Sequence, residues 1–222
     1  MKPRRLTLLG KLKRFLYDLC VPNHFYLNRL LSQCDSIVDL GCGTRSLLER
    51  LRVSPAFSLG IDVHQPSIDY NQKHGIYTEY RCIDLSEIER HLSEKFYDAV
   101  LMFDVLEHLT KDDGTVLLEK AQRIAKKFVI VHTPSGFFPQ AAAPDNPMEE
   151  HLSGWTVEEM RRLGYEVRGS NGLKMLRGDY TRIKWKPTFF WLTISFLTNY
   201  YVIRKPKSAY HILCVKTIKP AQ

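Results

Sequence analysis

Short hydrophobic runs alternate with amphipathic segments along the middle of the chain. Five runs rich in valine, isoleucine, leucine and aromatic residues predict buried strands at residues 36–40, 58–63, 77–84, 97–104 and 128–133. Between them, helical spacing or a helix-starting residue predicts helices over 46–53, 66–73, 86–93 and 112–125. This alternation predicts βαβ units, and so a parallel sheet with helices on both faces.

The C-terminal third adds two further strands to this sheet. Thr156-Val-Glu-Glu159 has the form of a capping box, which predicts a short helix that Gly164 would end. Residues 165–169 and 210–218 then read as strands six and seven. We therefore predict one α/β domain over 35–222, preceded by a basic helical extension over 1–34 and interrupted by an aromatic insert at 187–203.

Composition excludes several protein classes. The 222 residues are 44% hydrophobic and 25% charged, so the chain can bury an ordinary core and is not a disordered or fibrous protein. Its five cysteines form no CxxC pair, which argues against a disulfide framework or a structural zinc site. The basic start lacks a long apolar stretch and a small-residue cleavage site, so we expect no signal peptide and a cytoplasmic protein.

Charge is distributed in three blocks. Residues 1–30 carry seven basic residues and one acidic residue, residues 31–160 carry twelve and 21, and residues 161–222 carry thirteen and two. The blocks therefore have net charges of +6, −9 and +11. Two basic ends favour an anionic partner such as phosphate, nucleic acid or a membrane surface, although solvated lysines would give the same pattern.

The predicted strand ends carry the residues with chemical potential. Gly41 and Gly43 form a glycine turn after the first strand, where the backbone can approach a ligand closely and a helix N-terminus can face an anion. Asp39 lies within that strand, Asp62 ends the second strand and Asp84 ends the third. An acid at the second strand end suits the two hydroxyls of a ribose. Each acid could instead cap a helix.

These motifs resemble the class I S-adenosylmethionine-dependent methyltransferases, in particular the broad "type 11"-like group of small-molecule and glycan enzymes. The resemblance implies a Rossmann-like, seven-stranded, mostly parallel sheet and S-adenosylmethionine as cofactor. Arg45 departs from the pattern, because many members have a third glycine there. The cofactor residues that the resemblance implies lie at the ends of the first four strands: Asp39, Gly41, Cys42, Gly43, Asp62, Val63, Asp84, Leu85, Phe103 and Asp104.

A hydroxyl acceptor must lose a proton, and three histidines fall where the family's active-site mouth would be. They are His108, His132 and His151. We predict His151 as the catalytic base or a substrate contact, because it begins a loop that covers the site in relatives and an imidazole titrates near neutral pH. The alternative is a loop histidine that helps to order the following helix.

A metal site is a competing interpretation of nearby residues. Asp104-x-x-Glu107-His108, with His151 later, resembles a divalent-ion arrangement of RNA 3′-end and some quinone O-methyltransferases. Residues i, i+3 and i+4 share one helix face, so chelation is geometrically feasible. The same string occurs in many metal-free relatives, and we predict no metal.

The insert at 187–203 is 17 residues without a charge, between Lys184 and Lys186 on one side and Arg204, Lys205 and Lys207 on the other. It is short of the about 20 residues that a membrane-spanning helix needs. Three interpretations stay open: a helix over the substrate pocket or against a second subunit, a peripheral membrane element, or a nucleic-acid groove.

The sequence thus predicts an S-adenosylmethionine-dependent methyltransferase that acts at oxygen on a small-molecule, glycan or lipid-linked acceptor. Neither an Asn/Asp-Pro-Pro-Tyr/Phe run nor a Pro-Cys dipeptide is present, which argues against methylation of nucleobases. Two alternatives remain. One is an NAD-dependent oxidoreductase, since the glycine turn and Asp62 also suit a dinucleotide. The other is a non-catalytic, cofactor-binding membrane or RNA adaptor.

Overall fold

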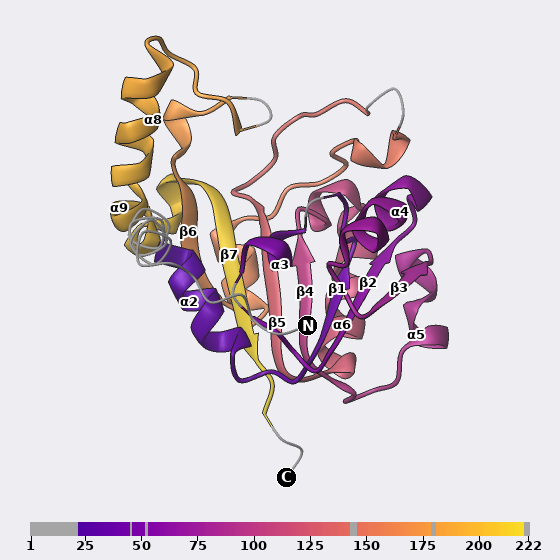
Figure 1. Cartoon of the computed structure of the whole chain (residues 1–222). Helices are drawn as coiled ribbons and strands as arrows, with labels where there is room; N and C mark the ends of the chain where they lie inside the picture. The colour runs from indigo at the N-terminus through magenta and orange to yellow at the C-terminus, as the bar shows by residue number, and fades with distance from the viewer. Residues whose placement is uncertain (1–21, 45, 52, 143–145, 179–180, 220–222) are drawn as a thin grey trace, which may run out of the picture.

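The computed structural model describes residues 22–44, 46–51, 53–142, 146–178 and 181–219, and its sheet has seven strands (Figure 1). The strand order is β3-β2-β1-β4-β5-β7-β6. Strands β1 to β5 are parallel, and β7 runs antiparallel to both β5 and β6. The predicted fold class is therefore confirmed. The strands are β1 Ser36–Leu40, β2 Phe57–Asp62, β3 Glu79–Cys82, β4 Tyr97–Phe103, β5 Ala125–Pro134, β6 Glu166–Leu173 and β7 Ala209–Thr217.

Helices cover both faces of the sheet, which explains why the central strands read as continuous hydrophobic runs. On one face, α2, α3 and α4 pack on Ile37 and Leu101. On the other, α5, α6 and α7 pack on Leu40 and Met102. The helices are α2 Pro22–Leu31, α3 Leu47–Arg50, α4 Gln65–His74, α5 Ile88–His91, α6 Lys111–Ile124, α7 Val157–Arg162, α8 Thr188–Leu197 and α9 Asn199–Arg204. Short 3₁₀ turns cover Leu85–Glu87, Leu106–His108, Pro147–Glu149, Lys174–Leu176 and Pro206–Ser208.

Local sequence signals fix several helix ends. The Thr110 side chain accepts a hydrogen bond from the Asp113 amide and begins α6. The predicted capping box at α7 is present, because Thr156 and Glu159 bond each other's backbone amides reciprocally. Gly75 ends α4 in the left-handed conformation, at φ 63°.

Several element boundaries differ from the prediction. The third strand, expected over 77–84, is only Glu79–Cys82. The Tyr77 hydroxyl donates to Asp39 before the strand begins, and the Asp84 side chain caps the 3₁₀ turn after it ends. The first helix after the glycine turn is Leu47–Arg50 rather than 46–53. The fifth strand is longer than expected because its start pairs with β4, at Tyr97 and Ala125. The sixth strand is longer because it pairs with β7 as far as Leu173.

The aromatic insert forms two helices, α8 and α9, on the outer edge of the sheet beside β6 (Figure 1). Two glycines of β6 allow this close packing. A Cβ at Gly169 would lie 2.2 Å from the carbonyl oxygen of Val202, and one at Gly172 would lie 2.4 Å from that of Ser195. None of the described helices combines the length and the apolar character needed to cross a bilayer.

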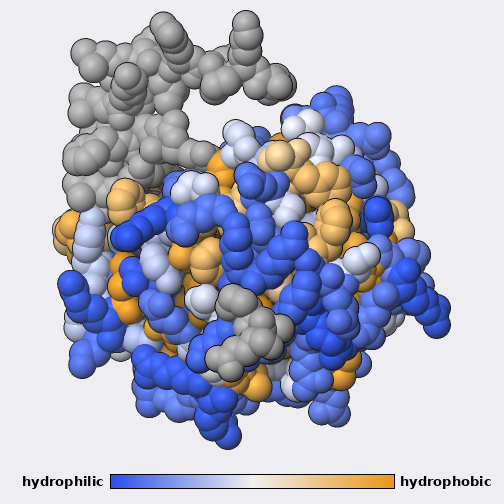
Figure 2. Space-filling view, turned by 90° about the horizontal axis from the view of Figure 1, so that it is seen from below, coloured by the Kyte–Doolittle hydropathy of each residue, from blue (hydrophilic) through white to orange (hydrophobic). Residues whose placement is uncertain are grey.

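The described part of the N-terminal segment packs directly on the domain. Leu27 and Leu31 of α2 belong to the core on the face of the sheet that α2, α3 and α4 cover. Asn23 Nδ2 donates to the Gly169 carbonyl at 2.8 Å. The rest of the predicted extension, residues 1–21, lies outside the described residues, as does Arg45. Seen from below the view of Figure 1, the described surface is mostly hydrophilic, and smaller hydrophobic patches lie among the hydrophilic residues (Figure 2).

Candidate active site

A cavity of about 1000 Å³ lies at the carboxyl ends of the parallel strands, where ligands bind in sheets of this kind. All ten residues predicted to bind the cofactor line it: Asp39, Gly41, Cys42, Gly43, Asp62, Val63, Asp84, Leu85, Phe103 and Asp104. His108 and His132 also line the cavity. His151 is absent from its lining. Its ring contacts the ring of His108, which does line the cavity, with centroids 4.9 Å apart.

The glycine turn needs glycine at two positions. Gly41 and Gly43 have φ of 71° and 51°, in the left-handed region that favours glycine. A Cβ at Gly41 would also lie 2.6 Å from a methyl of Val105. Asn71 of α4 holds the turn, because its Nδ2 donates to the Gly43 carbonyl at 2.6 Å and to the Cys42 sulfur at 3.4 Å. The turn is thus shaped before any ligand arrives.

Asp39 is buried beneath this turn. Its Oδ2 accepts hydrogen bonds from the hydroxyls of Tyr77, at 2.5 Å, and Ser46, at 2.7 Å. Its Oδ1 has no partner among the described residues. Burial raises the pKa of Asp39 to about 6, against the two hydrogen bonds, which lower it. A buried carboxylate oxygen without a partner favours a cationic or hydrogen-bond-donating ligand group.

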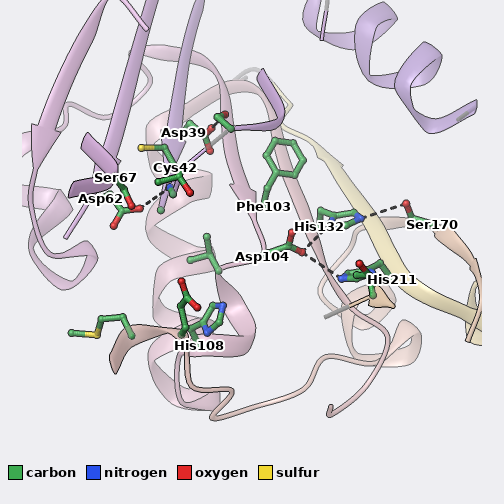
Figure 3. Close-up of a pocket in the computed structure, with 18 of the residues that line it drawn as sticks. Asp39, Cys42, Asp62, Ser67, Phe103, Asp104, His108, His132, Ser170 and His211 are labelled. Carbon is green, nitrogen blue, oxygen red and sulfur yellow. Dashed lines mark hydrogen bonds and ion pairs between the residues drawn. The ribbon is translucent and has the colours of Figure 1, made fainter. Parts of the chain in front are cut away.

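Asp62 lies on the other side of the turn (Figure 3). Its carboxylate accepts from the backbone N–H of Gly43 at 2.7 Å and from that of His64 at 2.8 Å. These bonds fix both oxygens at the rim of the cavity, and each keeps a lone pair for a hydroxyl. The Asp84 carboxylate accepts from the Ser86 amide at 2.8 Å, which is the helix-capping alternative for that residue.

The opposite side of the cavity is a wall of Asp104, His132 and His211, which we call the histidine wall (Figure 3). The Asp104 Oδ1 is 3.0 Å from His132 Nδ1 and 3.6 Å from His211 Nε2. The two imidazole rings stack, with centroids 4.7 Å apart and 10° between their planes. Asp104 has φ 54°, in the left-handed region that non-glycine residues adopt uncommonly and aspartate more often than most.

The ionisation of the wall follows from these contacts. Desolvation acts to raise the pKa of Asp104, but its electrostatic and hydrogen-bond interactions with His132 outweigh that effect and lower the pKa to about 2. Burial, followed by the charge of His132, lowers the pKa of His211 to about 3. At neutral pH the wall therefore holds a carboxylate anion beside a neutral imidazole.

Glu107, His108 and His151 form a second cluster (Figure 3 labels His108). Glu107 is buried and its Oε2 accepts from the Thr133 hydroxyl at 2.8 Å. Burial, followed by the charge of Asp104, raises its pKa well above the ordinary value. His151 Nδ1 lies 2.7 Å from the Phe138 carbonyl oxygen and His108 Nδ1 lies 3.1 Å from that of Glu150. Asp104 belongs to the histidine wall and not to this cluster.

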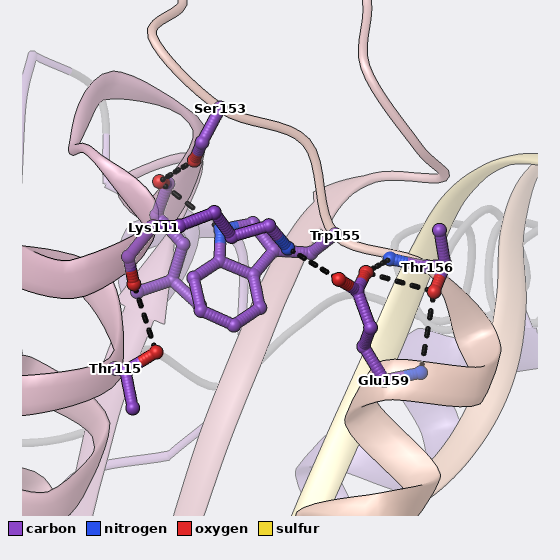
Figure 4. Close-up of polar contacts among 7 residues, drawn as sticks. Lys111, Thr115, Ser153, Trp155, Thr156 and Glu159 are labelled. Atoms are coloured by element: carbon purple, nitrogen blue, oxygen red, sulfur yellow. Dashed lines mark hydrogen bonds and ion pairs between the residues drawn. The ribbon is translucent and has the colours of Figure 1, made fainter.

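The segment that carries His151 is anchored by Trp155 (Figure 4). Trp155 is buried, its indole Nε1–H donates to the Leu106 carbonyl at 3.2 Å, and Ser153 Oγ donates to the same oxygen at 3.1 Å. The Lys111 ammonium lies over the indole ring at 3.8 Å and also pairs with Glu159. These contacts hold the loop to the 3₁₀ turn that follows β4.

Comparisons with known proteins agree with this geometry. Residues 38–131 match the family described as "Methyltransferase domain", and these residues include both the glycine turn and Asp62. A solved S-adenosylmethionine-dependent methyltransferase from Archaeoglobus fulgidus has the same fold, with a TM-score of 0.55 at 16% identity over 92% of this chain and 99% of that one. Residues 38–131 therefore belong to a methyltransferase domain, and the fold is that of the class I S-adenosylmethionine-dependent methyltransferases.

Two curated methyltransferases are similar in sequence. The ubiquinone biosynthesis O-methyltransferase of Chromobacterium violaceum is 28% identical over 111 residues, which cover 42% of this chain and 47% of that protein. The small RNA 2′-O-methyltransferase of Rattus norvegicus is 25% identical over 150 residues, which cover 59% of this chain and 37% of that protein. The chain thus spans less than half the length of either relative.

Four residues of this site were not identified from the sequence. Tyr77 and Ser46, which hold Asp39, read as strand and helix residues, and Asn71 reads as an ordinary helix residue. His211 lies inside the hydrophobic run of the last strand, where a histidine is commonly a core residue. Only the register of β7 against β5, which pairs His211 with Pro134, brings it to the cavity.

Proposed function

We propose that this methyltransferase transfers a methyl group from S-adenosylmethionine to an oxygen atom of a small-molecule, glycan or lipid-linked acceptor. The observation that carries the proposal is the buried, unpartnered Oδ1 of Asp39 beneath a preformed glycine turn. The amino group of the cofactor's methionine part suits that oxygen, and the ribose hydroxyls suit the Asp62 carboxylate. The residues therefore fit this cofactor, with Asp84 and Leu85 beside the adenine.

Oxygen as the acceptor atom is supported by the two relatives similar in sequence, each of which is named an O-methyltransferase. When bound, S-adenosylmethionine supplies an electrophilic methyl group on a positively charged sulfur. The acceptor oxygen would take this methyl group, forming a C–O bond while the C–S bond breaks and the sulfur keeps the bonding pair. The hydroxyl proton must pass to a base, so the acceptor end of the cavity needs polar groups. The histidine wall offers them.

His151 remains our prediction for the base or a substrate contact. Its place behind His108 means that it would act at the mouth of the cavity rather than at the histidine wall. Replacement of His151 by Gln should lower turnover and leave cofactor affinity within twofold. A loss of cofactor affinity would instead place His151 on the cofactor side.

The test of the cofactor is calorimetric titration of the purified protein with S-adenosylhomocysteine, with NAD titrated in parallel. We expect micromolar binding of S-adenosylhomocysteine and no measurable binding of NAD. Preference for NAD would support the oxidoreductase alternative and overturn the proposal. Binding without turnover of any hydroxyl acceptor, in a screen of glycans, polyprenyl lipids and RNA, would favour the adaptor.

The insert supports a membrane-facing acceptor. Helix α8 carries apolar side chains that project away from the core, with Phe189 83%, Phe190 54% and Leu197 68% exposed. The flanking Lys184, Lys186, Arg204 and Lys205 are exposed as well. Leu192 and Phe196 on the same helix line the cavity. We propose that α8 rests on an anionic bilayer surface and brings the cavity next to a lipid-linked acceptor.

Co-sedimentation with phosphatidylcholine vesicles, with and without phosphatidylserine, tests this arrangement. The wild-type protein should bind the anionic vesicles, and Phe189→Ser combined with Phe190→Ser should reduce binding at least tenfold. Val116→Ser, at a 48% exposed position on α6, is the matched control and should bind as wild type. Equal binding by all three proteins, or none by the wild type, would contradict the proposal.

A further inference from the structure

Three potential metal ligands converge at the acceptor end of the cavity from three neighbouring strands. Asp104 follows β4, His132 lies near the end of β5, and His211 lies in β7. The strands pair side by side, with Phe103 opposite His132 and Pro134 opposite His211. The carboxylate oxygen and one nitrogen of each imidazole all lie within 4.8 Å of one another. Rigid strands therefore set the spacing of these groups.

The spacing matches what a small divalent cation requires. Ligands at about 2.1 Å from a tetrahedral Zn²⁺ lie roughly 3.4 Å from each other. The Asp104 oxygen lies 3.0 Å from His132 Nδ1 and 3.6 Å from His211 Nε2. These two distances differ from that spacing by only a few tenths of an ångström. The imidazole rings stack with 10° between their planes, so one ring has to rotate before both lone pairs can point at one cation. Two imidazoles with one carboxylate are a common set for first-row divalent metals.

The outer nitrogens of both imidazoles have polar neighbours, as metal-binding histidines generally do. His132 Nε2 lies 3.4 Å from the Ser170 hydroxyl, and His211 Nδ1 lies 3.0 Å from the side-chain amide of Asn171. A half turn of that amide would place its oxygen there to accept from Nδ1–H, which leaves the lone pair of His211 Nε2 free for a metal. Asn171 also has φ 61°, so a second residue in the left-handed region lies at this site.

The exposure of the carboxylate distinguishes this site from the neighbouring cluster of Glu107, His108 and His151. In the histidine wall, the carboxylate of Asp104 faces the cavity with 55% of its side chain exposed. In the other cluster, Glu107 is buried and accepts from Thr133. A metal ligand has to be deprotonated, and a carboxylate open to the cavity meets that requirement more readily than a buried one.

We propose that Asp104, His132 and His211 bind one divalent transition-metal cation, with Zn²⁺ as the reference ion, and leave a coordination position open toward the cavity. Catalytic sites with three protein ligands keep such a position for water or substrate. The occupant that suits it is an oxygen of the acceptor, and this part rests on the proposed function. Binding of the cation itself does not depend on methyl transfer.

The test uses tag-free, full-length protein that has been freed of metal with a chelator. We would titrate Zn²⁺ by calorimetry and Co²⁺ by visible absorption, in a Cys82→Ser background because Cys82 is an exposed thiol. We expect one equivalent to bind, with the d–d bands of a four- or five-coordinate Co²⁺ site. His132→Gln and Asp104→Asn should each weaken binding at least tenfold, as should His211→Gln.

Two controls keep the result interpretable. His151→Gln alters only the neighbouring cluster, and His74→Gln removes an exposed histidine that stacks on Tyr70. Both should bind as wild type. Thermal unfolding, measured for each variant, shows whether it is folded. Because His211 is buried, the solvent-accessible His132 and Asp104 variants decide the outcome.

The proposal is overturned if wild-type protein binds neither metal, or if His151→Gln abolishes binding while His132→Gln preserves it. Its failure differs from failure of the proposed function. Protein that binds metal but no S-adenosylhomocysteine would retain the cation site and lose the methyltransferase assignment. Protein that binds S-adenosylhomocysteine but no metal would keep the methyltransferase assignment and lose the cation site.

Discussion

On one side of the cavity, Asp39 and Asp62 lie at the ends of adjacent strands and are held by Ser46, Tyr77 and the backbone of the same βαβ unit. On the other side, Asp104 and His211 meet only because an antiparallel strand inserts late in the fold. The first side, which we call the cofactor half, lies mostly within residues 36–85, and Phe103 and Asp104 complete the predicted cofactor set. The second side, which we call the acceptor half, takes its residues from the ends of β4 and β5 and from β7. The cofactor half therefore depends on local contacts, whereas the acceptor half depends on strand register.

The strongest test of this difference is removal of the Asp62 carboxylate. Asp62→Ala should weaken binding of S-adenosylhomocysteine more than tenfold, because each hydrogen bond to a charged group contributes about 1.5–3 kcal/mol. Metal binding in the acceptor half should stay unchanged. Asp69→Ala, an exposed carboxylate on α4 that accepts only from Gln65, is the matched control in calorimetry. Unchanged affinity in Asp62→Ala would remove the ribose role.

A smaller effect concerns the pH dependence of the cofactor half. The pKa of Asp39 is raised to about 6 in the folded protein, above its unfolded value near 3.8. Protonated Asp39 is thus favoured by folding, so its contribution to stability is full below about pH 4 and is lost as pH rises through about 6. Over that range the free energy of unfolding should fall by up to about 3 kcal/mol.

Urea unfolding of wild type and Asp39→Asn across pH 4 to 7 measures this contribution. The wild-type minus variant difference should decline as pH rises. Saturating S-adenosylhomocysteine should flatten that decline, because an ammonium group beside Asp39 stabilises the carboxylate. A difference that is constant with pH would show that Asp39 does not titrate in this range.

The smallest predicted effect lies in the acceptor half. Gly169→Ala places a methyl group 2.2 Å from the Val202 carbonyl oxygen, and such overpacking costs about 1–3 kcal/mol of unfolding free energy. Gly178→Ala meets only the flexible Lys184 side chain, at 3.4 Å, and should be nearly neutral. S-adenosylhomocysteine affinity should stay within twofold in both. A large loss of affinity in Gly169→Ala would show that the two halves are coupled.

The same difference explains what the sequence could predict. Alternation of hydrophobic runs and helical segments predicts parallel βαβ units, and the glycine turn and the strand-end acids Asp39 and Asp62 lie close together in the sequence. All ten predicted cofactor residues line the cavity for that reason. Their individual contacts with the cofactor stay a prediction.

The acceptor half has no such local signal. His132 was one of three candidate histidines, and neither its pairing with Asp104 nor the presence of His211 could be derived from spacing, because both need the register of β7. Strand ends were misjudged where a side chain left the strand pattern for the site or for a cap, as Tyr77 and Asp84 do. The two-helix form of the insert depends on the close approach that Gly169 and Gly172 allow.

Strand β7 follows β6 in the chain but lies between β5 and β6 in the sheet. During synthesis, β6 therefore leaves the ribosome with no neighbour, and the edge of β5 stays unpaired until residues 209–217 emerge. The cofactor half can fold on the nascent chain, while the acceptor half waits for His211. Until then β5, an interior strand of the finished sheet, is an unpaired edge, and unpaired strand edges favour aggregation.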